Sequence, residues 1–314
     1  MLSRKVIAVV VAIVALAPAS WAARRKMFPM NVPAAGAKTV AFDVQEGDFV
    51  VRGDPSVNEV QMRVSIDRYW LFKLGEEGIL KKLIQVDGEG TGALTIRTRI
   101  EPSWRNWMRA EYPIDFEIVV PAGANLQVHD TSGKIVITEM RGQVAVEDTS
   151  GTLEVQSVAG PVRIEKESGD IRVIDVAGAV TIGSKSGKLH VDRVGTLEIL
   201  RSSGNVEVMD AASARIENKD GNITVNGVKG ALIIDDDSGE IQVRNAGGEV
   251  AIHDTSGQIR TVQTGPLTVD DTSGDLTVER AASLTIRSKE SGAVKVKNVS
   301  GKVEAPETVA VKRQ

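Results

Sequence analysis

The 314-residue chain contains no cysteine, only three histidines and few aromatic residues: four Trp, two Tyr and five Phe. Without cysteine it has no disulfide and no lipid-attachment cysteine, so its stability must come from burial and backbone pairing. Beyond the N-terminus, no apolar run approaches the roughly 20 residues of a transmembrane helix. We therefore expect a mature chain without a transmembrane segment.

Residues 1–22 show the pattern of a cleaved secretory signal. Two basic residues, Arg4 and Lys5, precede an apolar run, and small residues lead to a cleavage site expected after Ala22. Removing the signal changes the net charge from −4 to −6, because Arg4 and Lys5 leave with it. This mild acidity argues against a nucleic-acid partner. We expect a periplasmic or secreted protein.

The clearest pattern is a glycine that recurs every 17 or 18 residues, nearly always after serine. An aliphatic residue follows two positions after every one of these glycines, and usually again two positions later. The glycines are Gly133, Gly151, Gly169, Gly187, Gly204, Gly221, Gly239, Gly257, Gly274 and Gly292.

This fixed period predicts an all-β parallel β-solenoid over residues 126–305, with about ten coils of two short strands each. Equal spacing is a physical requirement there, because each strand stacks on its equivalent one coil away, at about 4.8 Å. The narrow interior explains why no aromatic residue follows Phe116. A β-sandwich or antiparallel meander is the alternative, since frequent turn signals also fit that class.

Residues 23–125 are expected to form an irregular N-terminal cap with degenerate first coils, of which 47–54 is one. Residues 71–86 predict a helix that places Ile79, Leu80, Leu83 and Ile84 on one face, although Gly75 and Gly78 weaken its start. Residues 306–314 are expected to be a C-terminal tail.

The repeated (D/E)-x-S-G-x-(I/V)-x-V units, introduced by V-P-A-G-x-x-L at 120–126, resemble a known bacterial β-strand-repeat family. Its members are named "putative adhesins" of unknown function and are related to the toast-rack envelope domains. The resemblance covers roughly residues 40–305. It implies a secreted or periplasmic β-solenoid, often linked by genetic context to envelope-stress sensing. The family has no established catalytic residues, so none is transferred to this chain.

The tetrapeptide DTSG occurs at 130–133, 148–151, 254–257 and 271–274, and suggests at first half of an aspartic protease site. The position three residues before each glycine argues against catalysis, because Lys, Ser and Arg also occupy it. A corner explains these types better, since Asp, Asn and Ser accept backbone hydrogen bonds in turns and glycine permits a positive φ. The column is Asp130, Asp148, Lys166, Ser184, Arg201, Asn218, Asp236, Asp254, Asp271 and Lys289.

Neither a metal nor a catalytic site is expected. Asp236, Asp254 and Asp271 would stack on neighbouring coils and are weak calcium candidates, but a solvated acidic strip explains them better. The three histidines lie in different coils, so they cannot converge on one site, and no repeat carries the large loops of a β-helix enzyme. We expect no cofactor.

The candidate ligand site is the aromatic and basic stretch at 101–112, with Trp104, Arg105, Trp107 and Arg109. Ring faces and planar cations of this kind bind sugars, anionic headgroups or proteins. The alternative is that the tryptophans cover the end of the solenoid.

These features predict a non-enzymatic, adhesin-like binding or scaffold protein of the bacterial cell envelope, with an envelope protein or polysaccharide as partner. The alternative is a sensor or accessory component of an envelope-stress system with one specific protein partner. A carbohydrate-active β-helix enzyme ranks third.

Overall fold

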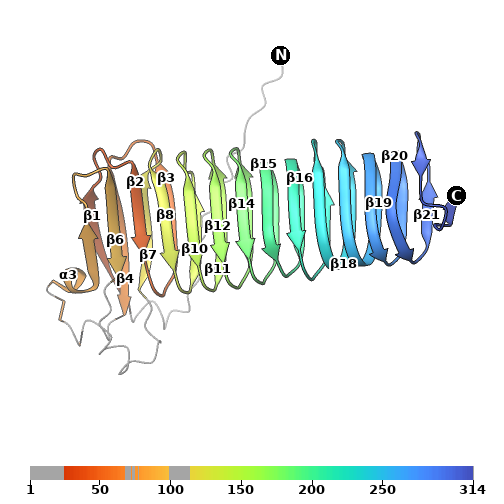
Figure 1. Cartoon of the computed structure of the whole chain (residues 1–314). Coiled ribbons are helices and arrows are strands. Elements are labelled where there is room, and N and C mark those ends of the chain that lie inside the picture. The colour runs from red at the N-terminus through yellow and green to blue at the C-terminus, as the bar shows by residue number, and fades with distance from the viewer. Residues whose placement is uncertain (1–24, 68–71, 73–74, 77, 99–113, 314) are drawn as a thin grey trace, which may run out of the picture.

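The fold is an elongated parallel β-solenoid with an N-terminal cap, seen in a computed structural model that describes residues 25–67, 72, 75–76, 78–98 and 114–313 (Figure 1). The elements that precede the repeat are β1 (Arg25–Pro33), β2 (Thr39–Asp43), β3 (Phe49–Asp54), β4 (Glu59–Asp67), α3 (Ile79–Leu83), β5 (Ile84–Asp87), β6 (Ala93–Thr98) and β7 (Asp115–Pro121). The strands of the repeat are β8 (Asn125–Asp130), β9 (Lys134–Thr138), β10 (Val144–Asp148), β11 (Thr152–Val158), β12 (Val162–Lys166), β13 (Ile171–Val176), β14 (Val180–Ser184), β15 (Leu189–Ser202), β16 (Val206–Asn218), β17 (Ile223–Asn226), β18 (Leu232–Ala246), β19 (Val250–Ser273), β20 (Leu276–Ser291), β21 (Val294–Lys297), β22 (Val303–Glu304) and β23 (Val311–Arg313).

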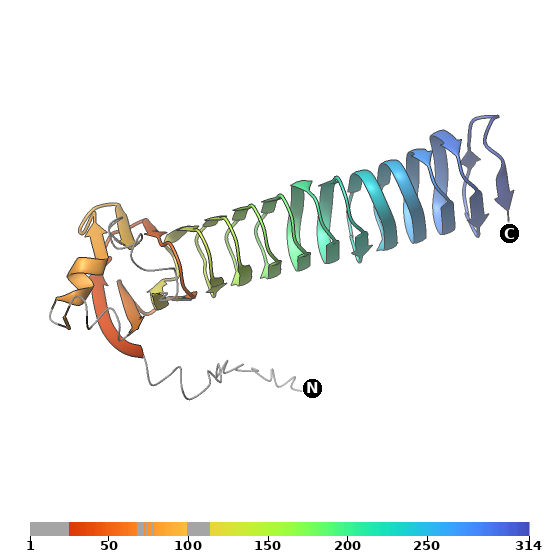
Figure 2. The same ribbon diagram turned by 90° about the horizontal axis from the view of Figure 1, so that it is seen from below.

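Each coil contributes to two faces. Face A is the strand segment before each Ser-Gly corner, and face B is the segment after it (Figure 2). On face A, β10 pairs in parallel with both β8 and β12. On face B, β11 pairs in parallel with both β9 and β13. The predicted parallel solenoid is confirmed, and the antiparallel alternatives are excluded for the repeat.

The core forms because the side chains of each segment alternate between inside and outside. In β12, Val162 and Ile164 are buried while Arg163 between them is exposed. The described aromatic core residues gather at the N-terminal end instead, where the Phe49 ring centroid lies 5.1 Å from that of Phe42 and 6.2 Å from that of Phe116. As predicted, the repeat itself is filled by aliphatic side chains.

The corner glycines stack directly on one another. A Cβ placed on Gly257 would lie 1.8 Å from the carbonyl oxygen of Gly239, and the φ angle of Gly257 is 151°. The same column begins at Gly47, because a Cβ on Gly133 would lie 2.0 Å from the Gly47 oxygen. Residues 47–54 therefore belong to a true coil, in which β2 pairs with β8 and β3 pairs with β9.

The second corner of each coil bends at a residue in the left-handed region, most of them not glycine. The sequence gives no sign of this column, because its residue types vary. It comprises Glu139, Ser157, Asp175, Arg193, Asp210, Gly227, Asn245, Gln263, Arg280 and Asn298. Such a conformation costs roughly 1 kcal/mol or more for a non-glycine residue. The stacked coils must supply that energy.

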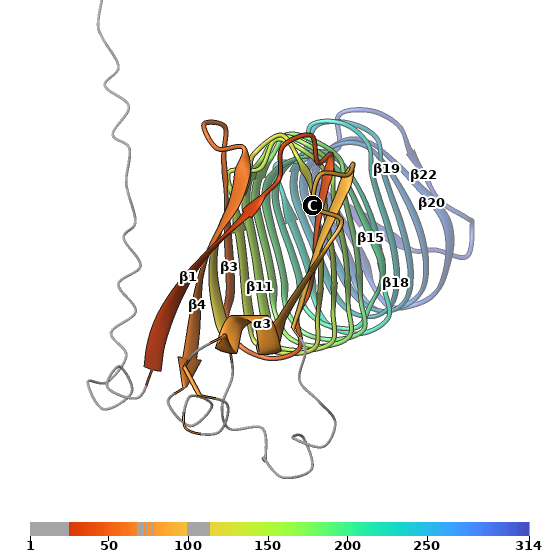
Figure 3. The same ribbon diagram turned by 90° about the vertical axis from the view of Figure 1, so that its left-hand side faces the viewer.

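The N-terminal end is closed by strands that break the parallel pattern (Figure 3). On face B, β7 pairs with β3 in parallel, but β4 and then β1 add to it antiparallel. On face A, β6 pairs with β2 in parallel and β5 adds antiparallel. The edge strand β1 carries Pro29 and Pro33, which lack the N–H that a further strand would need. At the N-terminal end, the described strands thus extend the two faces of the solenoid with antiparallel edges.

The prediction of a helix over residues 71–86 is wrong in its extent. Within the described part of that segment, α3 covers only five residues, and Ile84 already begins β5. Gly78 at the start of α3 has a φ of 68°, which interrupts a helix on its N-terminal side. On the other side Ile84 and Val86 enter strand β5, which pairs with β6. The predicted apolar face is partly right, since Ile79 and Leu83 are buried.

The C-terminal end continues the solenoid further than expected. β22 pairs with β20 on face A, and β23 pairs with β21 on face B. β23 lies within the segment 306–314 that was expected to be a tail. Both strands are short, and Pro306 separates them.

We predict that Gly257→Ala lowers the free energy of unfolding by about 3 kcal/mol or more, because the new Cβ collides with backbone and not with a movable side chain. Gly123→Ala is the matched control, since a Cβ there meets no heavy atom within 4 Å. Denaturant unfolding of both variants measures the difference. Equal stabilities would contradict the stacked column.

Candidate functional site: a buried polar column

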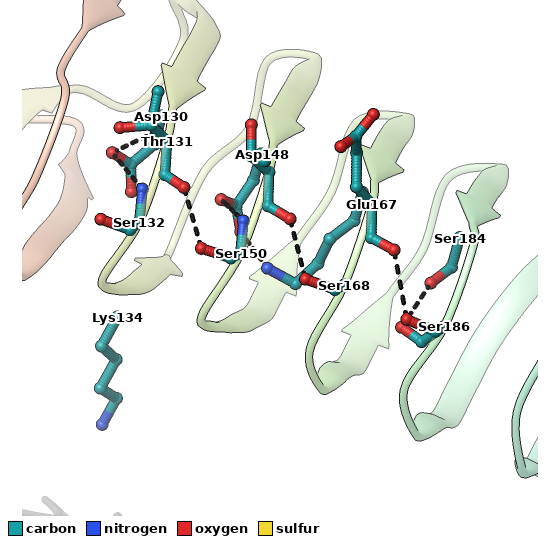
Figure 4. Close-up of polar contacts among 12 residues, drawn as sticks. Asp130, Thr131, Ser132, Lys134, Asp148, Ser150, Glu167, Ser168, Ser184 and Ser186 are labelled. Atoms are coloured by element: carbon teal, nitrogen blue, oxygen red, sulfur yellow. Dashed lines mark hydrogen bonds and ion pairs between the residues drawn. The ribbon is translucent and has the colours of Figure 1, made fainter.

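The DTSG corner is held by hydrogen bonds within and between coils (Figure 4). Oδ1 of Asp130 accepts from the Thr131 N–H at 2.8 Å, and Oδ1 of Asp148 accepts from the Ser150 N–H at 3.1 Å. The Ser150 hydroxyl donates to the Thr131 carbonyl of the preceding coil at 3.0 Å. At these two copies the predicted turn role of the aspartate is confirmed.

The serine has a role that the sequence did not reveal: at many corners its hydroxyl links the corner to the coil before it. The same bond from the serine hydroxyl to a carbonyl recurs along the repeat. The further pairs are Ser168–Thr149, Ser186–Glu167, Ser238–Lys219, Ser256–Asp237 and Ser273–Thr255.

The residues three before nine of the ten glycines, together with Ser202 before Gly204, point into the solenoid and form a buried polar column. None is more than 9% exposed. The members are Asp130, Asp148, Lys166, Ser184, Ser202, Asn218, Asp236, Asp254, Asp271 and Lys289. The expectation of a solvated strip is therefore wrong for Asp236, Asp254 and Asp271. The alternation explains why: Asp236 lies two residues after the inward Ile234, so it also faces inward.

Arg201, which sequence spacing placed in this column, is excluded from it. The pairing of β15 with β16 shifts between Ile199 and Ser202, and Ser202 becomes the partner of Asn218. Arg201 is exposed with a φ of 55°. The bulge thus keeps a guanidinium out of the apolar interior, where its charge would be costly.

The column contains five aspartates but only two lysines. Lys166 forms an ion pair with Asp148, and both side chains are fully buried. At the other end, Nζ of Lys289 lies 2.7 Å from Oδ2 of Asp271. Burial, and then the neighbouring Asp148, raise the pKa of Asp130 to about 7. The interior therefore holds more carboxyl groups than cations to pair with them.

The histidines are dispersed, as the repeat spacing predicted. Nδ1 of His129 lies 3.5 Å from Glu147, and Nδ1 of His190 lies 3.0 Å from Glu207. His253 lies 3.8 Å from Asp270, on another coil again. Across the described ranges, no group of three or more His, Asp or Glu side chains is arranged to hold a metal ion.

The predicted ligand residues Trp104, Arg105, Trp107 and Arg109 lie outside the described residues, as does the predicted signal at 1–22. Both stay predictions. In the part of the chain that is described, no helix has the length and apolar character needed to cross a bilayer.

The fold defines the class of this protein: a capped, parallel β-solenoid whose coils are tied at Ser-Gly corners. Residues 176–313 match the family described as Toastrack DUF4097, so this part of the chain is similar to the toast-rack domains. The resemblance seen in the sequence is confirmed there. No curated protein matches the chain.

Several solved structures are similar to this chain at low identity. A "putative adhesin" from Parabacteroides merdae is 13% identical, with 90% of this chain and 97% of that chain covered and a TM-score of 0.37. One from Bacteroides fragilis is 12% identical, with 89% and 96% covered and a TM-score of 0.34. A "putative cell adhesion protein" from Clostridium sporogenes is 10% identical, with 64% and 100% covered and a TM-score of 0.35.

We predict that Lys166→Met lowers the free energy of unfolding by about 3 to 5 kcal/mol at pH 8, because it leaves buried carboxylates without their cation. The loss should be smaller at pH 5, because the Asp130 carboxyl, whose pKa is raised to about 7, is then protonated and needs no cation. Denaturant titrations at both pH values measure this.

The matched control is Lys185→Met, one coil further along. Lys185 pairs with Glu167 at 2.5 Å, but its side chain is 73% exposed. Exposed pairs contribute little, so this variant should remain close to the parent protein. Similar losses for the two variants would contradict a buried role for Lys166.

Proposed function

We propose that the protein is a non-enzymatic binding or scaffold protein of the bacterial cell envelope. The observation that carries this proposal is the continuous 23-stranded sheet, which runs from the cap along the whole solenoid (Figure 1). Because side chains alternate along each strand, the outward ones form rows along the two faces. Such a surface suits an extended partner, whereas an enzyme needs groups that converge in a cleft.

Rigidity supports a display role. Backbone hydrogen bonds link each coil to the next, for example from Val144 N to Pro161 O at 2.9 Å and from Val162 N to Ala179 O at 2.9 Å. The rows of outward residues are therefore held at a repeat of about 4.8 Å, which a flexible chain could not maintain.

The outward positions of the repeat carry charges of both signs, and several of these charges are paired between coils. Arg193 donates to Asp175 and Arg215 donates to Asp235, each across neighbouring coils. Polar rows with both signs of charge favour a polar partner, such as a polysaccharide or the surface of an envelope protein, over an apolar one.

The binding end in this proposal is the N-terminal cap. The candidate residues Trp104 and Trp107 fall between β6 and β7, which both belong to the cap. The envelope location rests on the signal pattern of residues 1–22.

The test uses the mature chain, immobilised and exposed to envelope extract and to a polysaccharide array. We predict that a protein or glycan is retained and that Trp104→Ala with Trp107→Ala abolishes retention while the melting temperature stays unchanged. Lys295→Ala with Lys297→Ala, at the opposite end, is the control and should bind normally.

Two results would argue against this proposal. A large loss of stability in the tryptophan variant would assign those side chains to covering the solenoid. Turnover of a polysaccharide by the wild-type chain would indicate an enzyme.

A further inference from the structure

Three aspartates follow one another in the C-terminal half of the polar column. Asp236 on β18 is the register partner of Asp254 on β19, and Asp271 is the register partner of Lys289 on β20. Asp254 and Asp271 occupy equivalent positions of successive coils and interact electrostatically. The three residues are 2%, 0% and 0% exposed.

These carboxyl groups are poorly supplied with partners. Neither oxygen of Asp236 and neither oxygen of Asp254 accepts a hydrogen bond of normal length and angle from the described residues. Weaker contacts from the Asn218 side chain and the Ser238 N–H to Asp236, and from the Ser256 N–H to Asp254, lower the two pKa values but do not outweigh burial. The Lys289 ammonium forms an ion pair with Asp271 and donates to the carbonyls of Gly274 and Ser291, while its charge acts on Asp254 only at longer range. In the N-terminal copies, Asp130 and Asp148 accept hydrogen bonds of normal geometry from the corner backbone, whereas the equivalent contacts of the C-terminal aspartates are weaker.

The other groups around the three aspartates do not supply the missing positive charge. Asn218 precedes them in the column, and Lys289 follows. Nearby on the same strands, the Asp237 carboxylate adds negative charge, while His253 is an exposed side chain that points outward. The first inward residues of the facing segments, Ile241, Ile259 and Leu276, are aliphatic, and the buried Thr261 beyond them carries no charge.

If all three aspartates were ionised, two negative charges would remain unpaired inside the solenoid. Unpaired buried carboxylates are strongly unfavourable, and stacking them about 4.8 Å apart adds repulsion. A carboxylic acid, by contrast, can donate a hydrogen bond to the carboxylate on the next coil. We propose that Asp236, Asp254 and Asp271 form a proton-binding column, and that protons held between neighbouring coils stabilise the C-terminal half of the solenoid.

The electrostatics agree with this geometry. Burial, and then Asp254, raise the pKa of Asp236 to about 7. Burial, and then Asp271, raise the pKa of Asp254 to about 6, and burial raises the pKa of Asp271. An aspartate in the unfolded chain titrates at a pKa of about 3.9.

The direction of the pH effect follows from these values. Between about pH 4 and pH 7 the folded protein binds more protons than the unfolded chain, so the free energy of unfolding falls as pH rises. The stabilisation is fully present below this window and is lost above it. This trend is opposite to ordinary acid denaturation, in which paired carboxylates lose their partners at low pH.

The first test compares melting temperatures of the mature chain at pH 5 and pH 8. Wild type should melt at a lower temperature at pH 8, and Asp254→Asn should reduce that difference to less than about half, because an amide needs no proton. The chain already accepts Asn218 in this column. Asp237→Asn is the control: it removes the same charge from an exposed neighbour and should keep the wild-type pH dependence.

The second test uses only the wild-type protein, so it does not depend on the folding of a variant. Infrared spectroscopy separates the carbonyl band of protonated carboxyl groups from that of carboxylates, and wild type should show protonated groups at neutral pH. The proposal is overturned if those bands are absent, if Asp254→Asn and Asp237→Asn behave alike, or if calcium at pH 8 restores the melting temperature seen at pH 5. The last result would assign the column to a metal ion.

Discussion

Every feature of the repeat depends on stacking successive coils in register, with a separation of about 4.8 Å between equivalent strands. At this distance, residues that occupy the same position in neighbouring coils contact one another. Glycine therefore lies on glycine at the first corner, where no Cβ fits. Aliphatic side chains lie on aliphatic side chains inside, and polar side chains lie on polar side chains in the buried column.

Stacking also shows how the chain tolerates residues that do not fit. Arg201 is removed from the interior by a bulge, and Ser202 takes its place beside Asn218. A second irregularity lies between Val269 and Asp270, where Ile286 pairs with Val269 and Arg287 is passed over. In both coils the apolar residues and the residues of the buried polar column stay in register with the next coil, and an arginine is left out of the pairing. In-register stacking therefore preserves the contacts between coils even where the number of residues in a coil changes by one.

Much of the fold could be predicted because the constraint is periodic. The spacing of glycines such as Gly239 and Gly257 predicts stacked coils, and the aliphatic residues that follow predict which side chains face inward. The same alternation carried the signal that Asp236 and Asp254 are buried. A role in the turn also explained these aspartates, so the sequence alone did not distinguish an exposed turn residue from a buried one. Ser150 illustrates another limit, since its partner lies on the preceding coil.

Other features could not be predicted because they depend on tertiary context. The left-handed second corner is occupied by types as different as Glu139, Arg193 and Gln263, so no local propensity marks it. In the cap, the apolar pattern of residues 79–84 fits a helix, but pairing with β6 turns Ile84 into a strand residue. The ligand site expected around Trp104 remains a prediction from residue type.

In-register stacking can be tested most directly by distance measurement, and the absence of cysteine makes labelling clean. Spin labels at Thr224→Cys and Gln242→Cys would occupy register partners on β17 and β18. Electron paramagnetic resonance should show strong spin–spin coupling for this pair, with backbones about 5 Å apart, and weaker coupling for Thr224→Cys with Arg260→Cys, about 10 Å apart. No coupling in the first pair, or equal coupling in both, would contradict the stacked solenoid.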